Sequence, residues 1–288
     1  MNIFKKALGS LLTMISPSLN IRFMYFLSYK RKLSLSHPTS LAEKIQYLRI
    51  KYYNNSDLVA RCANKIDVRE YVKCCGYGFM LNDIIGIYND VDEVPWNDLP
   101  DQFAMKWNFG ATYNIICDNK SKLNVEAAKK IMKKWGKNKY WLPYAEMQYK
   151  NCSKKILIEK YLQTNKGFLP YDYKLYVFNG VVIAVLVIGD RDGEKKGAFY
   201  DRKWNYIGTP QKHYKSFSDE VERPDDFNLM IECAETLAKP FPFVRVDFFD
   251  YNGKAIFGEM TFTPAAGLYM ATIPIDGKEM GEYLKLQL

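Results

Sequence analysis

The chain has 288 residues, of which 48% are hydrophobic and 25% are charged. This composition is typical of a globular protein with a sizeable core, and it excludes a disordered, collagen-like or coiled-coil protein. The first 54 residues contain nine Lys and Arg and a single acid, Glu43, so only +1 of the formal net charge of +9 belongs to the other 234 residues, and no nucleic-acid-binding surface is expected there.

Residues 1–60 are predicted to form a basic helical region. Its longest uncharged run, residues 7–21, contains Pro17 and is shorter than the roughly 20 apolar residues that a membrane span needs. Two interpretations stay open: helices that pack on the body with their charges in solvent, or an amphipathic patch that rests on an anionic membrane face. In the second, the apolar side consists of Ile3, Phe4, Leu8, Leu11, Leu12 and Ile15, and the charges are those of Lys5, Lys6, Arg22, Lys30, Arg31 and Lys32.

Residues 61–154 are predicted to form a small α+β subdomain. Ser40 and Glu43 form a capping box that begins a helix shortly before it, and two apolar strands around a short loop indicate a hairpin. Gly136 is expected to end the last helix. In chain order, the expected elements are helices over about 41–54 and near 64–75, strands over 103–108 and 113–117, and a helix from Asn124 to Trp135.

Residues 155–288 are predicted to form a larger subdomain rich in strands, after a linker near 150–155. Asn-Gly pairs at 179–180 and 252–253 are strong signals for hairpin turns. Antiparallel hairpins interleaved with helices indicate an α+β fold rather than a doubly wound parallel sheet. The expected elements are strands over 155–162, 172–178 and 181–189, a strand pair over 243–262, and helices over 227–237 and about 278–287.

The six cysteines and two histidines exclude several kinds of site. No two cysteines form a C-x-x-C pair, so neither a zinc site nor a disulfide framework is expected, and a reducing, cytoplasmic compartment fits best. A Cys–His or Ser–His–Asp catalytic unit would need His37 or His213, and neither follows a nucleophile motif.

Two carboxylates on the last predicted hairpin suggest a metal site. Asp247 and Glu259 share one face of the sheet if the hairpin contains a bulge or an odd loop, and Arg245 then points to the same side. Such carboxylates repel each other unless a cation lies between them. Oxygen ligands favour Mg²⁺, which commonly takes phosphate oxygens as its other ligands. Removing one carboxylate is therefore expected to stabilise the metal-free form. The alternative is that the two carboxylates lie on a solvent-exposed edge of the sheet. The apolar residues around them in the sequence disfavour this alternative.

Two lysines on predicted strands extend this interpretation. Lys106 and Lys174 each interrupt an apolar strand, where a lysine normally reaches water or an anion. Taken alone, each lysine is explained by a strand position that faces solvent. Together with the two carboxylates, they suit a nucleoside triphosphate with Mg²⁺.

The order of these segments resembles the ATP-grasp superfamily, and most closely its polysaccharide-associated branch, typified by teichuronopeptide-biosynthesis proteins. This resemblance implies a fold in which two α+β subdomains clamp ATP, here with an N-terminal helical extension. It also implies an activity that joins a carboxylate to an amine through an acylphosphate. It runs from about Ser40 to the C-terminus and is carried by the stretches TSLAEKIQYL, NKIDVREYV, FAMKWNFGATYNIIC, ILIEKYL, DYKLYVFNG and FPFVRVDFFDYNGKAIFGEMTFTP.

The resemblance implies roles for the basic residues at the phosphates. Lys65 and Arg69 match the bases of an early helix that face the phosphates, and Lys106 resembles the strand lysine that contacts the α- and β-phosphates. Lys174 matches the base that steadies the γ-phosphate. Arg245 resembles the arginine that stabilises the tetrahedral oxyanion.

The resemblance likewise implies an adenine site and a metal site. The hinge against the adenine consists of Glu159, Lys160, Tyr161 and Leu162, with Glu159 accepting from the adenine amino group. The Mg²⁺ ligands match Asp247, Glu259 and Thr261. Thr261 stands where the family usually has an asparagine, and a hydroxyl is a weaker metal ligand than an amide oxygen. Whether the site holds one metal ion or two is therefore left open.

Two loops contain less glycine than this resemblance implies. The loop over 108–113 has one glycine, and Ala265-Ala266-Gly267 follow Pro264. Both changes restrict how closely a backbone can approach a phosphate or a substrate. They indicate an altered acceptor or weak catalysis.

The leading hypothesis is an ATP-dependent carboxylate–amine ligase with ATP and Mg²⁺ as cofactors. Its substrates would be an acidic saccharide of a surface polysaccharide and an amine donor, and its location the cytoplasm, with a peripheral contact to the inner membrane face left open. One alternative is a nucleotide-sugar glycosyltransferase that uses Asp190-Arg191-Asp192, although Asp90-Val91-Asp92 shows that this pattern recurs by chance. The other is a non-catalytic ATP-grasp scaffold.

Overall fold

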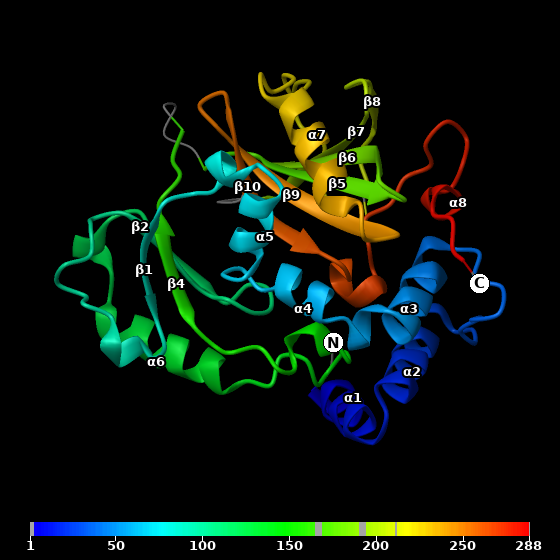
Figure 1. Cartoon of the computed structure of the whole chain (residues 1–288), viewed down its shortest axis with the longest axis horizontal. Helices are drawn as coiled ribbons and strands as arrows, with labels where there is room; N and C mark the ends of the chain where they lie inside the picture. The colour runs from blue at the N-terminus through cyan, green and yellow to red at the C-terminus, as the bar shows by residue number, and fades with distance from the viewer. Residues whose placement is uncertain (1–2, 165–168, 190–193, 211, 288) are drawn as a thin grey trace.

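The computed structural model describes residues 3–164, 169–189, 194–210 and 212–287, and these form two antiparallel sheets with helices around them (Figure 1). The four-stranded sheet has the order β1 (Ile84–Tyr88), β4 (Ile156–Lys160), β2 (Phe103–Trp107), β3 (Asn114–Cys117). The six-stranded sheet has the order β10 (Lys254–Thr261), β9 (Phe243–Tyr251), β5 (Asp172–Phe178), β6 (Val181–Gly189), β7 (Lys196–Asp201), β8 (Tyr206–Gly208). The Asp190–Asp192 motif lies outside the described residues.

The four-stranded sheet has its own core beneath α6 (Val125–Lys137). Asn124 begins this helix, since its side chain accepts from the backbone N–H of Ala127 at 2.9 Å. The helix continues through Gly136 to Lys137, so the expected end at Gly136 is wrong. A Cβ at position 136 would lie 2.5 Å from the ring of Trp107, and the glycine therefore permits close packing of α6 on β2 rather than ending the helix.

The two Asn-Gly turns of the six-stranded sheet are confirmed. Asn179 and Gly180 have φ angles of 48° and 81°, and Asn252 and Gly253 have 55° and 82°. Two successive residues with positive φ form the tight turn that matches the twist of a hairpin, which explains why asparagine and glycine stand there. Helix α7 (Phe227–Ala238) packs against this sheet (Figure 1).

Three helices follow the N-terminal pair in the chain and precede the first strand. Helix α3 (Leu41–Lys51) begins with the predicted capping box. The helix expected near 64–75 is present as α5 (Val68–Cys74), and a further helix that was not expected, α4 (Asp57–Ala63), precedes it. Asn64 separates them, because its side chain accepts from the backbone N–H of Ile66 at 2.9 Å and turns the chain. In Figure 1, α4 and α5 lie between the two sheets.

Two boundaries differ from the sequence-based expectation. Strand β4 pairs with β1 and β2, so it lies in the four-stranded sheet although the expected subdomain boundary at residue 154 precedes it. The C-terminal helix α8 (Met280–Tyr283) is shorter than expected. Lys44 explains the position of the C-terminal segment beside α3, since its ammonium donates to the carbonyls of Gly281 and Leu284 at 2.8 Å each.

The N-terminal region forms two helices, α1 (Ile3–Ile15) and α2 (Pro17–Tyr29), at the edge of the molecule (Figure 1). Thr13 and Asn20 attach them to the body through the backbone carbonyls of Leu142 and Pro143. No helix in the described part of the chain combines the length and the apolar character that crossing a membrane requires.

Candidate active site

Asp247 and Glu259 lie directly opposite each other on the hairpin of β9 and β10. The strand pairing shifts by one residue between Phe257 and Glu259, so Gly258 is an extra residue in β10. Without this bulge, Glu259 would lie opposite Val246 and point to the other face of the sheet. A Cβ on residue 258 would come 3.0 Å from the backbone carbonyl oxygen of Asp247, which explains the glycine.

Two cations contact the buried carboxylate of Asp247. Arg245 donates through Nε and Nη2 to its two oxygens at 2.7 Å each, and Lys174 Nζ donates to Oδ2 at 2.6 Å. Burial by itself would raise the pKa of Asp247, but the charges and hydrogen bonds of Arg245 and Lys174 outweigh it and hold this pKa below its ordinary value. Asp247 is therefore ionised at neutral pH.

Asp172 is a second carboxylate on Lys174. Its Oδ2 lies 2.6 Å from Lys174 Nζ. Burial alone would lower the pKa of Lys174, but Asp172 and Asp247 raise it above the ordinary value, so this lysine stays charged. Asp172 was missed from the sequence, although it stands two residues before Lys174 and therefore on the same face of β5.

Thr261 connects Arg245 to Glu259. Its hydroxyl accepts from Arg245 Nη2 and donates to Glu259 Oε1, both at 3.2 Å. The guanidinium of Arg245 also lies 3.8 Å from Glu259 Oε1. The two carboxylates of the hairpin are thus joined by one cation and one hydroxyl.

A second charged group lies on the four-stranded sheet, around the buried Glu159. Its Oε1 lies 3.1 Å from Arg69 Nη1 and its Oε2 lies 2.5 Å from Lys106 Nζ. Arg69 also donates to the backbone carbonyl of Asn82 at 2.6 Å, which fixes α5 to the strand that follows. Both oxygens of Glu159 thus have cationic partners, and its expected contact with the adenine stays a prediction.

Lys65 links the two groups. It stands in the turn between α4 and α5, donates to the backbone carbonyl of Gly110 at 2.6 Å and lies 3.7 Å from Glu259 Oε2. Burial lowers the pKa of Lys65, and the charge of Glu259 opposes that effect. One ammonium therefore connects the loop of the β2–β3 hairpin with the carboxylate hairpin of the other sheet.

Two of the four expected hinge residues line an open cleft of about 840 Å³. Lys160 and Tyr161 line it together with Asp83, Gln163 and Tyr251. Glu159 and Leu162 do not line it, and neither do the carboxylates of β9 and β10. The cleft thus lies beside the last residues of β4 and β9, Lys160 and Tyr251, and the charged groups described above do not line it.

A buried arginine holds the loop after Pro264. Arg49 is 1% exposed and donates to the backbone carbonyl of Ala266 at 2.7 Å and to that of Ala145 at 3.0 Å. Gln46 donates to the same loop at Ala266 and Gly267. Neither residue was expected to act here, because an arginine in the last turn of a helix ordinarily faces solvent.

The backbone of this loop is strained. Ala265 and Ala266 have φ angles of 47° and 55°, in the left-handed region that disfavours alanine, and Gly267 follows at 67°. The sequence showed fewer glycines here than the ATP-grasp resemblance implies. The structure shows that the alanines nevertheless adopt the conformation that glycine favours, beside the carboxylate hairpin.

Glu146 is a further acid that the sequence did not indicate. It is buried, and its Oε1 accepts from the hydroxyl of Thr263 at 3.0 Å. Burial raises its pKa, although the charge of Arg49 and the Thr263 hydrogen bond oppose the shift. The neighbouring Gln148 donates to the same hydroxyl at 3.1 Å. These contacts tie the segment before β4 to the end of β10.

The donor atoms of the hairpin fit Mg²⁺. Asp247, Glu259 and Thr261 offer oxygen atoms, the ligands that Mg²⁺ prefers. No group of three acidic, histidine or cysteine side chains in the described residues could hold a metal ion. An ion between Asp247 and Glu259 would therefore take its other ligands from phosphate and water.

Five basic side chains and several carboxylates thus meet between two antiparallel sheets. Residues of these types can hold a nucleoside triphosphate with a metal ion. A family model described as TupA-like ATPgrasp matches residues 43–285. The chain belongs to the TupA-like ATP-grasp family. This membership confirms the expected ATP-grasp fold of the α+β class, whereas the role of each site residue stays a prediction.

Several solved structures of ATP-grasp proteins are similar to this member of the TupA-like family. D-Alanine–D-alanine ligase from Bacillus anthracis complexed with ATP is 13% identical with a TM-score of 0.44, over 81% of this chain and 65% of that one. The ATP-grasp ligase PsnB complexed with its minimal precursor is 12% identical with a TM-score of 0.39, over 77% and 60%. No curated protein matches the chain. The chain spans less than two thirds of the length of these two structures.

Proposed function

We propose that this protein is an ATP-dependent carboxylate–amine ligase that forms an amide through an acylphosphate. The observation that carries this proposal is the single charged site in which Lys65 connects Gly110 of one sheet with Glu259 of the other. The family membership supports ATP as the nucleotide. All the basic residues expected at the phosphates lie in this site, which favours an enzyme over a non-catalytic scaffold.

The reaction has two steps. A carboxylate oxygen of the acceptor attacks the γ-phosphorus of ATP, the bond to the β-phosphate oxygen breaks, and an acylphosphate and ADP result. The amine then attacks the acyl carbon, loses a proton to water, and displaces phosphate as the amide forms. Phosphorylation supplies the leaving group that a free carboxylate lacks, and the protein contributes position and positive charge.

Each cation of the site is paired with a carboxylate, and in this proposal the phosphate oxygens of ATP would compete with these carboxylates. Lys106 and Arg69 are bound to Glu159, and Lys174 is bound to Asp172 and Asp247. Triphosphate oxygens are stronger competitors for these ammonium and guanidinium groups than water is. In this proposal Lys106 binds the α- and β-phosphates and Lys174 the γ-phosphate.

Arg245 would act in the second step. Its guanidinium is held by two bonds to Asp247, and the hydroxyl of Thr261 accepts a third. Burial alone would lower its pKa, but Asp247 raises it, so the side chain stays cationic. A fixed cation at this place would stabilise the oxyanion that forms when the amine attacks the acyl carbon.

Mg²⁺ would be held by Asp247 and Glu259, with Thr261 beside them, and when bound it would neutralise the charge that develops on the phosphates. The hinge of Glu159, Lys160, Tyr161 and Leu162 would contact the adenine. We assign the carboxylate to an acidic saccharide of a surface polysaccharide or its precursor and the amine to an amino compound, on the strength of the resemblance to teichuronopeptide-biosynthesis proteins. A cytoplasmic location belongs to the same proposal.

Hydroxylamine trapping tests the proposal. Purified protein is incubated with MgATP, hydroxylamine and either a glucuronic-acid oligosaccharide or the matching neutral glucose oligosaccharide. We expect ADP and a hydroxamate with the uronate only, since hydroxylamine replaces the amine at the acylphosphate. Formation of ADP without hydroxamate in the presence of the uronate would contradict the ligase.

A further inference from the structure

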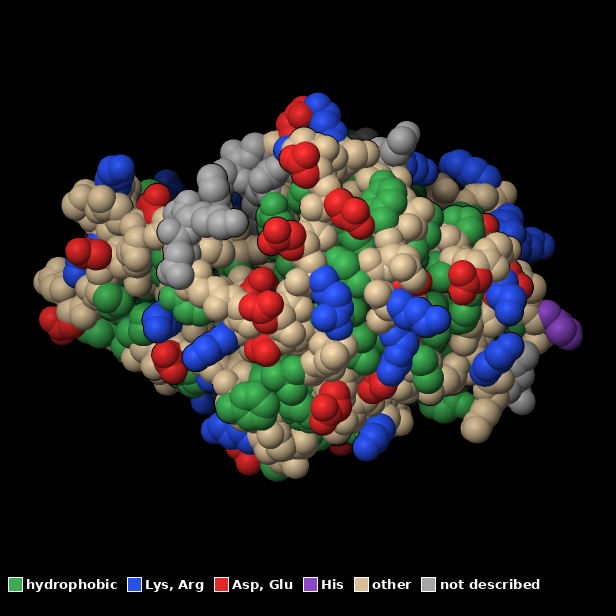
Figure 2. Space-filling model, turned by 90° about the horizontal axis from the view of Figure 1, so that it is seen from above, with side chains coloured by type: hydrophobic (Ala, Val, Ile, Leu, Met, Phe, Trp, Pro, Cys, Tyr) green, Lys and Arg blue, Asp and Glu red, His purple; other side chains and the backbone are tan. Residues whose placement is uncertain are grey.

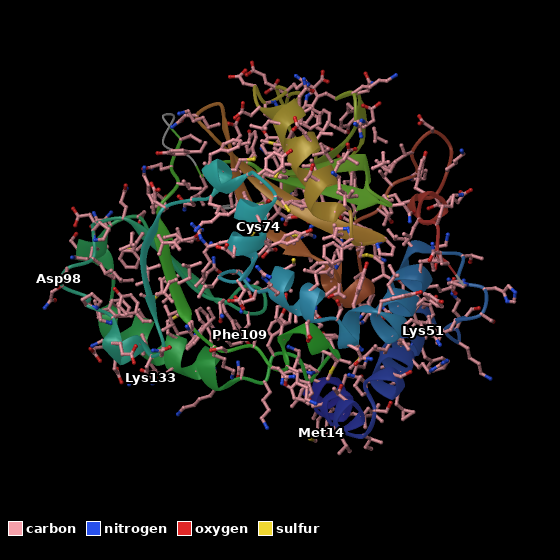
Figure 3. All side chains as sticks on the ribbon, in the orientation of Figure 1. Met14, Lys51, Cys74, Asp98, Phe109 and Lys133 are labelled. Atoms are coloured by element: carbon pink, nitrogen blue, oxygen red, sulfur yellow. The ribbon has the colours of Figure 1, made fainter. Side chains whose placement is uncertain are left out.

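The apolar face of α1 points away from the protein. Phe4, Leu8, Leu11 and Ile15 recur at helical spacing, and they are 81%, 44%, 51% and 69% exposed. Met14 lies beside them and reaches the lower margin of the molecule in Figure 3. A surface helix of a globular protein ordinarily turns its apolar stripe inward, so this orientation needs an explanation.

Buried polar contacts fix α1 in this orientation. On the side opposite the exposed stripe, Thr13 donates to the backbone carbonyl of Leu142 at 2.7 Å, and Asn20 of α2 donates to Thr13 at 2.6 Å. A Cβ at Gly9 would lie 2.6 Å from the carbonyl oxygen of Pro143, so the helix lies close against the body. Turning the apolar stripe inward would leave these buried polar groups without partners, which is costly.

Helix α2 also exposes apolar side chains. Leu19 and Phe26 are exposed and lie seven residues apart, two turns along the same side of the helix, with the exposed Arg22 between them. The opposite side of α2, which includes Ile21 and Met24, is buried. We call the exposed apolar surface of both helices the N-terminal patch; it consists of Phe4, Leu8, Leu11, Met14, Ile15, Leu19 and Phe26.

The charge around the N-terminal patch has one sign. No acidic residue precedes Glu43 in the sequence, and the exposed bases of this region are Lys5, Lys6, Arg22, Lys30, Arg31 and Lys32. Among the residues that the structure describes, Arg31 alone of these bases forms an ion pair, at 3.4 Å from Glu43. By contrast, the face of the molecule in Figure 2, on the side of α7, shows acidic and basic side chains interspersed.

We propose that the N-terminal patch docks onto the surface of an anionic lipid bilayer. Its apolar side chains would enter the boundary between headgroups and acyl chains, and the surrounding bases would contact the headgroup phosphates. A second copy of the chain fits this surface poorly, because pairing two patches would bring two sets of bases together. The proposal is independent of the ligase activity.

Vesicle sedimentation with the full chain tests the proposal. One set of vesicles contains phosphatidylcholine alone and the other equal parts of phosphatidylcholine and phosphatidylglycerol. Leu11→Ser with Ile15→Ser removes part of the N-terminal patch, and its matched control is Phe79→Ser with Ile116→Ser, two exposed apolar residues on other elements. Lys5→Gln with Lys6→Gln removes charge, and its control is Lys203→Gln with Lys254→Gln, two exposed lysines elsewhere.

We expect the wild-type chain to sediment with the anionic vesicles and to be released by salt. The serine pair should weaken binding by about tenfold or more, and the Lys5 and Lys6 pair by about fivefold for each lysine. Both control pairs should bind like the wild type, and all variants should melt at the wild-type temperature. No binding by the wild type, equal binding to neutral vesicles, or unchanged binding by the serine pair would overturn the proposal. A wild-type dimer in buffer that the serine pair converts to a monomer would overturn it too, since a second copy would then cover the patch.

Discussion

Arg245 forms a two-point ion pair with Asp247, its neighbour two residues further along β9, at 2.7 Å for each contact. Lys174 contacts the same carboxylate from the adjacent strand. Asp247 therefore lies between two cations that the chain itself supplies. The repulsion between Asp247 and Glu259 that the sequence suggested is offset in the protein itself.

Asp247→Asn tests this relationship. We expect it to abolish ATP turnover and to lower the free energy of unfolding by about 3 kcal/mol or more, because two buried cations lose their shared counter-charge. This corrects the expectation from the sequence that removing one carboxylate would stabilise the metal-free form. Urea unfolding measures the change, with Asp98→Asn, an exposed acid labelled in Figure 3, as the control. A variant as stable as the wild type would show that the ion pairs contribute nothing.

Lys65→Gln tests the link between the sheets. Loss of the ammonium should weaken MgATP binding by about tenfold or more, since a charge-assisted hydrogen bond is worth about 1.5–3 kcal/mol. Isothermal titration of MgATP measures the affinity. Lys73→Gln on the exposed side of α5 is the matched control and should bind like the wild type. Equal affinity of the two variants would remove Lys65 from the nucleotide site.

Ala265→Gly should stabilise the protein by about 1 kcal/mol, because glycine adopts the left-handed conformation that Ala265 holds at a cost. The residue is exposed, so no packing is lost. Ala127→Gly, at an exposed position inside α6, should instead destabilise by about 1 kcal/mol. Thermal unfolding of both variants measures these opposite signs. A loss of stability in both would argue against strain in the loop.

Glu146→Gln tests the buried acid near the end of β10. Because folding raises the pKa of Glu146, the folded chain binds more protons than the unfolded chain as pH rises above the unfolded pKa of about 4.3. The contribution of Glu146 to the free energy of unfolding therefore falls as the pH rises from its unfolded pKa to its folded pKa. Glutamine removes this dependence, and we expect the variant to gain stability relative to the wild type at neutral pH. Urea unfolding at pH 4 and pH 7 compares the two, and a variant less stable at pH 7 would contradict the account.

Local sequence patterns predicted most of the strands and their turns. The Asn179-Gly180 and Asn252-Gly253 pairs required positive φ angles, and both turns have them. The bulge that brings Glu259 opposite Asp247 was one of two options that the spacing allowed. These features depend on residues close together in the chain, which is why the sequence alone could indicate them.

The long-range contacts of the site could not be predicted in this way. Arg49 lies in the last turn of α3, and only the folded chain shows that it donates to a carbonyl of a loop more than 200 residues away. Glu146 stands in a stretch without regular periodicity. The sequence also did not show to which sheet each strand belongs, because β4 pairs with β1 and β2, which lie far from it in the chain.

Transfer of oxygen from the carboxylate to phosphate tests the central claim most directly. The uronate that supports ADP formation is labelled with ¹⁸O in its carboxylate, and the phosphate released with an amine and MgATP is analysed by mass spectrometry. Attack of that carboxylate on the γ-phosphorus predicts one ¹⁸O atom in each phosphate released, and no labelled phosphate with Asp247→Asn. Phosphate without ¹⁸O, released at the same rate as ADP, would contradict an acylphosphate and with it the ligase.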